Sequence, residues 1–462
     1  VEFVPVDDPP AGGMKKTFFS PDRSYVVQFF HDQATGQDPA RLARLEAVLG
    51  KYNPTTDAKN GDYWKRLFCW PTGIVVKPQL GIVAPTYSRD YFFETGPFQG
   101  SEKKGKWFTS PKLSKYLPAS ERGDWLNYFK LSILLARAVR RLHQAGLAHS
   151  DLSCNNVLID PSRGQMVVID IDSLVVPQLF PPDVLGTAGY IAPEVLRTLR
   201  LPLRDPKRIH PSASTDQHAL AVLIYEHLLV RHPLRGPKVN SVVSSEEDEH
   251  LSMGEKALFI EHPTDISNHV KGLKFSYTDL GPYLGDLFQR AFVQGLQASN
   301  SRPAAIEWER ALIRTWDFLH PCPSSSCPQK WFVLHDPKKL RCPACGTGLK
   351  EPVPLLKFRK EARPGQWLND GQLVVHPKGL SLCKWHAFAN LFPGEEADRT
   401  PQGYFAFHQG KWILVNQALS SLTSPGGNRV PVGQAVELVD GAQIRLSQEP
   451  NGRIAEVQIL RP

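Results

Sequence analysis

Short hydrophobic runs separated by turn residues predict several strands at the start of the chain. The candidate strands are Val1–Val6, Lys16–Ser20, Tyr25–Phe30, Thr72–Lys77 and Gly81–Ala84. Residues Pro39–Leu49 instead carry leucine and valine at helical spacing, so we expect one helix among these strands.

The middle of the chain has a helical pattern, and its end has a β pattern. Residues 125–146 place large apolar side chains on one helical stripe. Further helices are expected over Asp216–Val230 and residues 303–318, and a polar, acidic loop over Ser241–Glu249. From about residue 351 short β-like runs alternate with Gly and Pro turns, which predicts a small all-β domain.

The composition is that of an ordinary globular protein. Of 462 residues, 41% are hydrophobic and 22% are charged, which excludes wholesale disorder, and the length predicts about three domains. The net charge of +8 favours anionic partners such as nucleotides, nucleic acid or acidic protein faces. No apolar run has the length of a membrane span, and the start lacks the pattern of a signal peptide. Because the seven cysteines are odd in number and four cluster, we expect a cytoplasmic, reducing location.

Three polar residues near the middle of the chain have the chemistry that phosphoryl transfer needs. Such transfer requires a carboxylate to orient the attacking hydroxyl and oxygen ligands to hold Mg²⁺ against phosphates. Asp151 and Asn156, five positions apart on one loop, can supply a base and a metal ligand. Asp170, at the end of a hydrophobic strand, can supply a second metal ligand.

The order of these residues resembles that of the protein kinase family. In that family the catalytic loop is followed by the metal-binding Asp and then by an Ala-Pro-Glu motif, which here ends in Glu194. Asp216 fits the buried Asp that opens the family's large central helix, and Arg302 fits the arginine that pairs with Glu194. The resemblance implies ATP, Mg²⁺ and a protein substrate.

Several family positions depart from the usual pattern. The Arg before the catalytic Asp is Ser150, so by resemblance activation does not need a phosphate that pairs with that Arg. The Lys two residues after the Asp is Ser153. The usual Asp-Phe-Gly is Asp170-Ile171-Asp172, in which Asp172 adds a carboxylate able to join metal binding. These changes leave open a pseudokinase that binds nucleotide without turnover.

The lysine that holds the nucleotide phosphates in the family is absent from its strand. Gln28 stands at that position, and a neutral amide cannot replace the charge. The preceding loop carries Gly12, Gly13, Lys15 and Lys16. It resembles the with-no-lysine kinases, in which a Lys from the glycine-rich loop enters the phosphate pocket. By this resemblance we assign the phosphate contact to Lys15, with Lys16 second. Adjacent side chains of an extended segment point in opposite directions, so we expect only one of the two to point in; two solvated lysines are the alternative.

Further nucleotide and substrate contacts follow from the same resemblance. Glu46 is the candidate partner of the phosphate Lys, with a surface helix charge as the alternative. Ala84 and Thr86 follow a strand and match the hinge, whose backbone would hydrogen-bond adenine. Thr187 resembles the threonine that contacts the catalytic Asp in Ser/Thr kinases, and it favours a Ser/Thr acceptor.

Four cysteines in two pairs predict a metal site. The pairs are Cys322 with Cys327 and Cys342 with Cys345. Two knuckles of paired thiolates satisfy tetrahedral Zn²⁺, and a site closed by four cysteines is structural rather than catalytic. We expect a zinc ribbon over residues 319–350, with four buried free thiols as the alternative and with His320 and His335 as alternate ligands.

The C-terminal segment, residues 351–462, resembles a forkhead-associated β-sandwich, whose family binds phosphothreonine. The family's Ser-Arg-x-His motif appears as a segment from Cys383 to His386, and no Gly-Arg opens the domain. No Asn-Gly-Thr follows Asn416 either. We therefore favour a protein-docking β module over a phosphate-binding one.

These features together predict an α+β chain: a bilobal protein-kinase fold, followed by the zinc ribbon and a small all-β sandwich. The N-lobe is expected over residues 1–88 and the C-lobe over residues 89–318. The predicted function is ATP-dependent phosphorylation of Ser/Thr, including autophosphorylation; the alternatives are a nucleotide-binding pseudokinase scaffold and a zinc-ribbon nucleic-acid-binding protein. The layout resembles bacterial stress-response kinases that work beside a metal-dependent phosphatase and a von Willebrand A-type protein. The few basic residues of the ribbon disfavour nucleic acid, and no membrane partner is expected.

Overall fold

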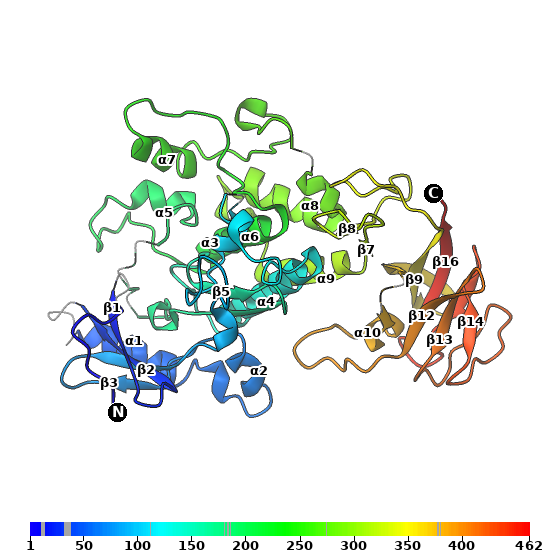
Figure 1. Cartoon of the computed structure of the whole chain (residues 1–462), viewed down its shortest axis with the longest axis horizontal. Helices are drawn as coiled ribbons and strands as arrows, with labels where there is room; N and C mark the ends of the chain where they lie inside the picture. The colour runs from blue at the N-terminus through cyan, green and yellow to red at the C-terminus, as the bar shows by residue number, and fades with distance from the viewer. Residues whose placement is uncertain are drawn as a thin grey trace. The chain divides into compact units, whose positions relative to one another are not determined.

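The computed structural model describes residues 1–10, 14–31, 38–110, 112–179, 181–182, 184, 186–273, 275–376, 378 and 380–462. They fall into two compact units. The first unit holds Val1–Leu273 with Asp286–Glu309, and the second holds Lys274–Gly285 with Arg310–Pro462. Figure 1 shows the elements of each unit in chain order.

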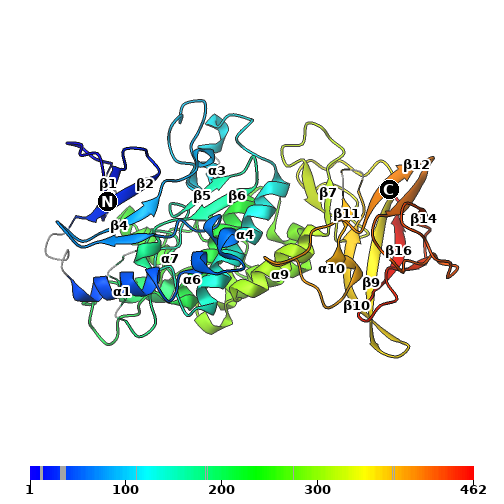
Figure 2. The same cartoon turned by 90° about the horizontal axis from the view of Figure 1, so that it is seen from below.

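A four-stranded antiparallel sheet and one helix open the first unit. The strands are β1 (Lys15–Phe19), β2 (Tyr25–Phe30), β3 (Gly73–Val75) and β4 (Gly81–Pro85), in the order β1-β2-β4-β3. Helix α1 (Pro39–Leu49) lies beside this sheet (Figure 2). It begins at Asp38, whose side chain accepts a hydrogen bond from the Ala40 amide at 2.9 Å and so satisfies one of the free amides of the first turn.

The predicted first strand does not form. Residues 1–6 carry no strand, although the Val4 amide donates to the Phe19 carbonyl at 2.9 Å. Phe3 packs against Phe18 and Phe29, while Val1, Val4 and Val6 are exposed. The segment is therefore held by one aromatic side chain and a few hydrogen bonds, and no strand ladder forms.

Helices make up most of the rest of the first unit. They are α2 (Gly61–Lys65), α3 (Lys106–Thr109), α4 (Trp125–Gln144), α5 (Pro193–Thr198), α6 (Ala213–Leu229) and α7 (Ser245–Met253). A two-stranded ladder pairs β5 (Val157–Asp160) with β6 (Gln165–Val168). Two further helices are α8 (Pro282–Gln289) and α9 (Ala305–Trp316). The single-turn helices of the first unit are η2 (Pro54–Thr56), η3 (Arg89–Tyr91), η4 (Ser114–Tyr116), η5 (Ile171–Ser173), η6 (Ile266–Asn268) and η9 (Ser299–Ser301), with a π-helical turn η8 (Arg290–Gln294). The single-turn helix η7 (Tyr277–Leu280) lies in the second unit.

The acidic tract expected to be a loop is partly helical. Helix α7 occupies Ser245–Met253, and the Ser244 side chain caps it by accepting from the Glu247 amide at 3.0 Å. Three acidic side chains lie in its first turn, where the positive end of the helix dipole stabilises them. The expectation of a loop over Ser241–Glu249 was therefore wrong for most of that tract.

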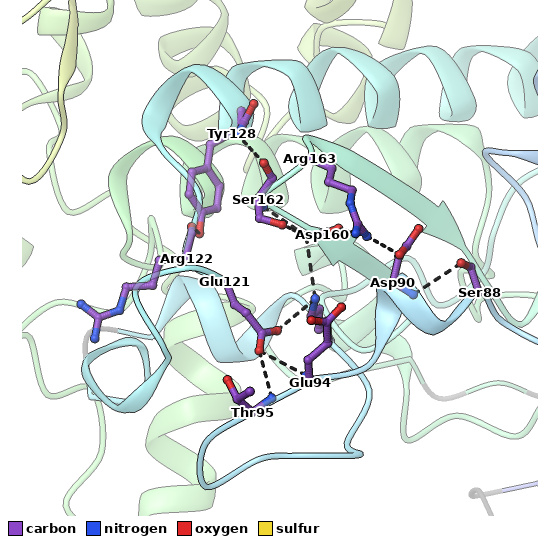
Figure 3. A network of polar contacts seen from close by, with 12 residues as sticks. Ser88, Asp90, Glu94, Thr95, Glu121, Arg122, Tyr128, Asp160, Ser162 and Arg163 are labelled. Atoms are coloured by element: carbon purple, nitrogen blue, oxygen red, sulfur yellow. Dashed lines mark hydrogen bonds and ion pairs between the residues drawn. The ribbon is translucent and has the colours of Figure 1, made fainter.

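A polar network anchors the loops that precede α4 to the end of β5 (Figure 3). Arg163 forms ion pairs with Asp90 and with Asp160, which is fully buried. Glu121 accepts hydrogen bonds from the amides of the preceding loop and pairs with the buried Lys103 at 3.0 Å. Because each buried carboxylate has a cationic partner, the network can lie inside the unit without an isolated charge.

The second unit is built from β-structure. A short ladder pairs β7 (Leu319–Pro321) with β8 (Trp331–Val333). One four-stranded sheet has the order β10-β9-β16-β15, with β9 (Val353–Arg363), β10 (Gln366–Val374), β15 (Gln443–Arg445) and β16 (Ile454–Leu460). The other has the order β11-β12-β13-β14, with β11 (Ser381–Leu382), β12 (Gly403–His408), β13 (Lys411–Asn416) and β14 (Ala435–Glu437). A short helix, α10 (Lys384–Ala387), follows β11.

One hydrophobic core joins the two sheets of the second unit. Phe358 and Leu356 of β9 and Leu414 of β13 belong to the same buried cluster. In a strand alternate side chains face the same side, so each sheet contributes one apolar face to this core.

None of the helices in the described ranges has the length and apolar composition that a membrane crossing would need.

Candidate functional site

The loop that carries Asp151 is held by two hydrogen bonds of His149, one from its amide and one from its ring. The His149 amide donates to the carboxylate of Asp216 at 2.7 Å, and the His149 ring bonds to the Ile169 carbonyl at 2.8 Å. Asp216 lies buried in the first turn of α6, as the sequence predicted. These contacts fix the loop against α6 and against the end of β6.

Asp151 and Asn156 are in direct contact. The Asn156 amide nitrogen donates to Asp151 Oδ2 at 2.9 Å and to the Asp151 carbonyl at 2.8 Å. Burial raises the pKa of the Asp151 carboxyl, although hydrogen bonds from Thr187, the charge of His149 and the Asn156 bond act in the opposite direction. The sequence assigned Thr187 to this position, and it lines a small pocket together with Asp151.

Asp170 and Asp172 flank a tight turn after β6. Asp170 adopts the left-handed backbone region (φ 58°, ψ 39°), and the single-turn helix η5 follows it. This conformation is uncommon outside glycine, though Asp and Asn tolerate it better than other residues. The Ser173 hydroxyl donates to the Asp170 carbonyl at 2.8 Å and stabilises the turn.

Lys15 points inward and contacts both of these carboxylates. Its Nζ lies 2.6 Å from Asp172 Oδ1 and 3.3 Å from Asp170 Oδ1, and the residue is 9% exposed. Burial alone would lower the pKa of the Lys15 ammonium, but the charges and hydrogen bonds of Asp172 and Asp170 outweigh it and raise that pKa. Lys16 is exposed, so the alternation expected for an extended segment is confirmed. Gly12 and Gly13 lie outside the described residues.

The position before Asp151 has a structural role of its own. Ser150 has a positive φ of 38°, and its hydroxyl donates to the Ser173 carbonyl at 2.8 Å. This bond ties the Asp151 loop directly to the turn that carries Asp170 and Asp172. The contact runs through backbone and hydroxyl, and it needs no arginine at this position.

Lys15, Asp151, Asn156, Asp170 and Asp172 line one cavity of about 530 Å³. Its charged and amide lining among the described residues comprises Lys15, Gln28, Arg41, Arg44, Glu102, Lys104, Asp151, Asn156, Asp170 and Asp172. The volume lies within the range of ordinary small-ligand sites, about 300–1,000 Å³. The cavity therefore brings carboxylates able to hold Mg²⁺ together with cations able to hold phosphate.

Glu46 does not take the position that the resemblance gave it. It is exposed on α1, and Lys15 pairs with Asp170 and Asp172 instead. The face of α1 toward the cavity carries Arg41 and Arg44. The expectation of a lysine–Glu46 pair is corrected on this ground.

The two arginines of α1 were missed by sequence reasoning, although a signal was present. Arg41 and Arg44 share the helical stripe of the buried Leu45 and Val48, at spacings of one turn. Arg44 is 6% exposed, and burial together with the charge of Arg41 lowers the pKa of its guanidinium. A buried cation beside a second cation is a position in which an anion would be favoured.

The two residues assigned to the hinge come just before Tyr87, which lines the cavity. Ala84 is buried in β4, where it pairs with Val26, and the Thr86 hydroxyl donates to the Arg23 carbonyl at 2.8 Å. Tyr87 lines the cavity instead, and burial raises the pKa of its phenol. Ala84 and Thr86 are not among the described residues that line the cavity, and their role at the hinge stays a prediction.

A second pairing expected from the sequence is confirmed away from the cavity. Arg302 donates to both carboxylate oxygens of Glu194 at 2.7 Å, and its side chain is 1% exposed. It also donates to the Ser214 carbonyl at 2.9 Å. A bidentate, buried pair of this kind fixes α5 to the start of α6.

The four cysteines of the second unit converge as a metal site would require. The Sγ atoms of Cys322 and Cys345 lie 3.5 Å apart, those of Cys327 and Cys342 lie 3.9 Å apart, and all four lie within 4.8 Å of one another. Zn–S bonds of about 2.3 Å in a tetrahedron place sulfurs about 3.8 Å apart. The donor set therefore fits a four-coordinate thiophilic cation. His320, proposed as an alternate ligand, instead bonds through its ring to the Pro321 carbonyl.

The residues of the forkhead-associated resemblance serve internal contacts. The Cys383 amide donates to the His386 ring at 3.0 Å, and His386 is buried. Asn416 donates to the carbonyls of Leu419 and Val430, each at 2.8 Å. These polar groups therefore bind the protein itself. The forkhead-associated interpretation stays a prediction.

Part of the chain is similar to known protein kinases. Residues 127–280 match the family model of the protein kinase domain. The chain is 30% identical over 152 residues to the probable serine/threonine-protein kinase RTK1 of Saccharomyces cerevisiae, covering 31% of this chain and 20% of that protein. It is 35% identical over 120 residues to the serine/threonine-protein kinase WNG2 of Toxoplasma gondii, covering 25% of this chain and 21% of that protein. The chain thus spans about a fifth of the length of these relatives.

A solved structure is also similar. The kinase PK-1 of the Cydia pomonella granulovirus is 16% identical, with a TM-score of 0.41, over 66% of this chain and 91% of that one.

Proposed function

We propose that the chain is an ATP-dependent kinase that phosphorylates Ser and Thr hydroxyls of proteins, including its own, on the basis of the match of residues 127–280 to the model of the protein kinase domain. One observation supports this most: Asp151, Asp170 and Lys15 line a single cavity of about 530 Å³. Phosphoryl transfer is mostly positioning and charge stabilisation, and this cavity supplies groups for both.

Asp151 is the proposed base that orients the acceptor hydroxyl and accepts its proton. Its carboxylate shares the cavity with Asp170 and is held in place by the Asn156 amide. Thr187 lies beside Asp151, as expected of a residue that helps to place a Ser/Thr acceptor.

Asn156 and Asp170 are the proposed Mg²⁺ ligands. The Asn156 nitrogen is engaged with Asp151, which leaves its amide oxygen as the group able to bind a cation. The Asp170 side chain is 42% exposed and lines the cavity. Carboxylate and amide oxygens are the ligands that hard cations prefer. When bound, Mg²⁺ would neutralise phosphate charge at this place.

Lys15 is the proposed phosphate lysine in place of Gln28. The Gln28 amide donates to the Thr17 hydroxyl at 3.1 Å, so its polar group is used within the sheet. Asp172 then takes the part that Glu46 was expected to play, because it holds the Lys15 ammonium at 2.6 Å. Arg41 and Arg44 add positive charge from α1, and we assign them to the phosphates as well.

The cysteine cluster is proposed to bind Zn²⁺ as a structural site, because four thiolates leave no open coordination position. Metal analysis of the purified chain should give one zinc per molecule. Replacement of the fully buried Cys342 by Ser should remove the zinc and loosen residues 319–350, since a site of this kind contributes folding energy. A wild-type chain that contains no zinc, yet still protects the amide hydrogens of residues 319–350 from exchange, would contradict this assignment.

The setting of the kinase is carried over from resemblance alone. We propose a cytoplasmic, bacterial protein with a metal-dependent phosphatase and a von Willebrand A-type protein as partners. The β module of the second unit is the proposed docking part.

A pseudokinase scaffold is the second candidate, and one observation favours it. The Lys15 ammonium is bound to both Asp170 and Asp172, so it occupies a carboxylate that Mg²⁺ would need. In that case the chain would bind nucleotide without transferring phosphate.

Transfer of labelled phosphate from ATP separates the two candidates. The wild type should label itself or a generic Ser/Thr substrate, and Asp151→Asn should lower the rate by about 10²–10⁴-fold while nucleotide still binds. Exposed Lys16→Met is the matched control and should keep the rate. Nucleotide binding without labelling in the wild type would establish the scaffold instead.

A further inference from the structure

The second unit contains a polar cavity of about 340 Å³ that the proposed kinase function does not use. Strands β9 and β10 form one wall, and Arg314 and Tyr283 form another. The Arg314 guanidinium lies over the Tyr283 ring at 5.4 Å, which holds this cation at the cavity.

A β-bulge shapes the strand wall. Lys357 pairs with Gln372, and Arg359 pairs with Asn369, but two residues of β10 stand opposite the single residue between them on β9. One of the two is Gly371, whose φ of 121° disfavours any other residue. Such bulges re-aim side chains and often border binding sites.

The four paired side chains face the same cavity. Lys357 and Arg359 are two apart on a strand and therefore share a face, and their partners Gln372 and Asn369 line the cavity with them. An ammonium, a guanidinium and two carboxamides all offer N–H donors. The wall is therefore rich in donors at close spacing.

The acidic groups nearby are already paired. Asp370 is held by Arg453 at 2.5 Å and by Lys360 at 3.0 Å, and Glu456 is held by Arg359. Among the described residues, no carboxylate lies within ion-pair distance of Lys357.

Two cations of the cavity thus remain without an acidic partner. Arg314 also has no carboxylate within ion-pair distance among the residues that the structure describes, and the buried Nε of Arg359 has no hydrogen-bond partner there. After these internal contacts, Lys357 and Arg314 keep an uncompensated positive charge, and Arg359 keeps one buried N–H donor. Buried donors of native proteins are generally satisfied by protein, water or ligand.

We propose that this cavity binds the oxyanionic group of a small ligand, a phosphate ester or a carboxylate. Lys357 and Arg314 would provide the charge, the Nε–H of Arg359 would provide one further donor, and Gln372 and Asn369 would fix the orientation of the oxygens. Charge-assisted hydrogen bonds to oxyanions are the stronger kind, and Arg suits phosphate and carboxylate geometry in particular. This site is independent of the kinase reaction.

Calorimetric titration of the full chain with inorganic phosphate and, separately, with malonate tests the proposal. Lys357→Met and Arg314→Gln should each weaken binding about tenfold, as expected when one charge-assisted bond is lost. Lys411→Met is the matched control, because Lys411 lies on β13, away from these strands, where it pairs with Glu437; it should bind as the wild type does. An unchanged melting temperature of each variant shows that the fold is intact.

The outcomes separate the two sources of the oxyanion and the two cavities of the chain. Preference for phosphate identifies a phosphate ester, and preference for malonate identifies a carboxylate. Absence of binding in the wild type overturns the proposal. Binding that Lys15→Met removes and Lys357→Met leaves intact belongs to the kinase cavity and overturns it equally.

Discussion

The carboxylates and the cations of the large cavity are held in different ways. The acidic set, Asp151, Asp170 and Asp172, lies together with the amide of Asn156 on loops that are fixed by hydrogen bonds between side chains and main-chain groups. The cationic set, Lys15, Arg41 and Arg44, reaches the cavity through long side chains from a strand and a helix.

The comparison indicates which functional groups of such a site can be supplied from different positions in the sequence. A base and a metal ligand must stand at fixed distances from the reacting atoms, so the backbone that carries them is constrained. Positive charge can come from any element whose side chain reaches the phosphates, and the proposed role of Lys15 in place of Gln28 would be an example. The acidic set therefore keeps a familiar sequence pattern, and the cationic set does not.

Removal of a charge from the acidic set should have the largest effect. Asp170→Asn should lower phosphate transfer by about a hundredfold or more, because an amide cannot replace the charge of a metal ligand. Steady-state rates at increasing Mg²⁺ measure this, and the Mg²⁺ concentration for half-maximal rate should rise. A variant with wild-type Mg²⁺ dependence would remove Asp170 from the metal site.

Removal of a charge from the cationic set should weaken binding of phosphates more selectively. Arg44→Met should lower affinity for ATP about tenfold, the loss expected for one charge-assisted bond, and should leave AMP affinity nearly unchanged. Glu46→Gln, on the exposed face of the same helix, is the control. Equal losses for AMP and ATP would show that Arg44 acts on the fold of α1 rather than on phosphate.

Removal of the contact between Asp172 and Lys15, which joins the two sets, should have a smaller effect. Asp172→Asn leaves Lys15 with Asp170 as its remaining carboxylate, so the lysine should compete more strongly with Mg²⁺ there. We expect about a fivefold loss of apparent Mg²⁺ affinity, equivalent to about 1 kcal/mol. An increased affinity would mean that Asp172 does not draw Lys15 away from Asp170.

The smallest effect should appear in the pH dependence. The pKa of Asp151 is raised by burial, and its base form is lost as pH falls, so the rate should decline at a higher pH than for an exposed Asp. Thr187 hydrogen bonds lower this pKa, so Thr187→Ala should move the acid limb of the rate profile to higher pH. Thr187→Ser keeps the hydroxyl and should leave the limb in place. A shift to lower pH in Thr187→Ala would contradict the assigned contact.

The arrangement of the acidic set could be predicted from the sequence because its spacing follows from local chain geometry. Asp151 and Asn156 share one loop, and Asp216 holds that loop through the His149 amide. Strand alternation predicted that only one of Lys15 and Lys16 points inward, and the resemblance selected Lys15; Lys15 is buried and Lys16 is exposed.

The environment of the cations could not be predicted in the same way. Charged residues were expected at the surface, so the position of Arg41 and Arg44 on the stripe of Leu45 was not used. Glu46 was chosen by resemblance, and tertiary packing decided which side of the helix faces the cavity.

Local signals were also overlooked in α7. Ser244 is followed three positions later by Glu247, a spacing typical of a helix start, although the tract is too polar to show a hydrophobic stripe.

Exchange of the two residues at the phosphate position tests the central claim most directly. Lys15→Met should abolish ATP binding and transfer, and Gln28→Lys in the same chain should restore part of both, because the charge returns to the same cavity from the neighbouring strand. Both are measured by ATP titration and by transfer of labelled phosphate, with Gln28→Lys alone as the reference. Full activity in Lys15→Met, without any second change, would contradict the claim that Lys15 supplies the phosphate charge.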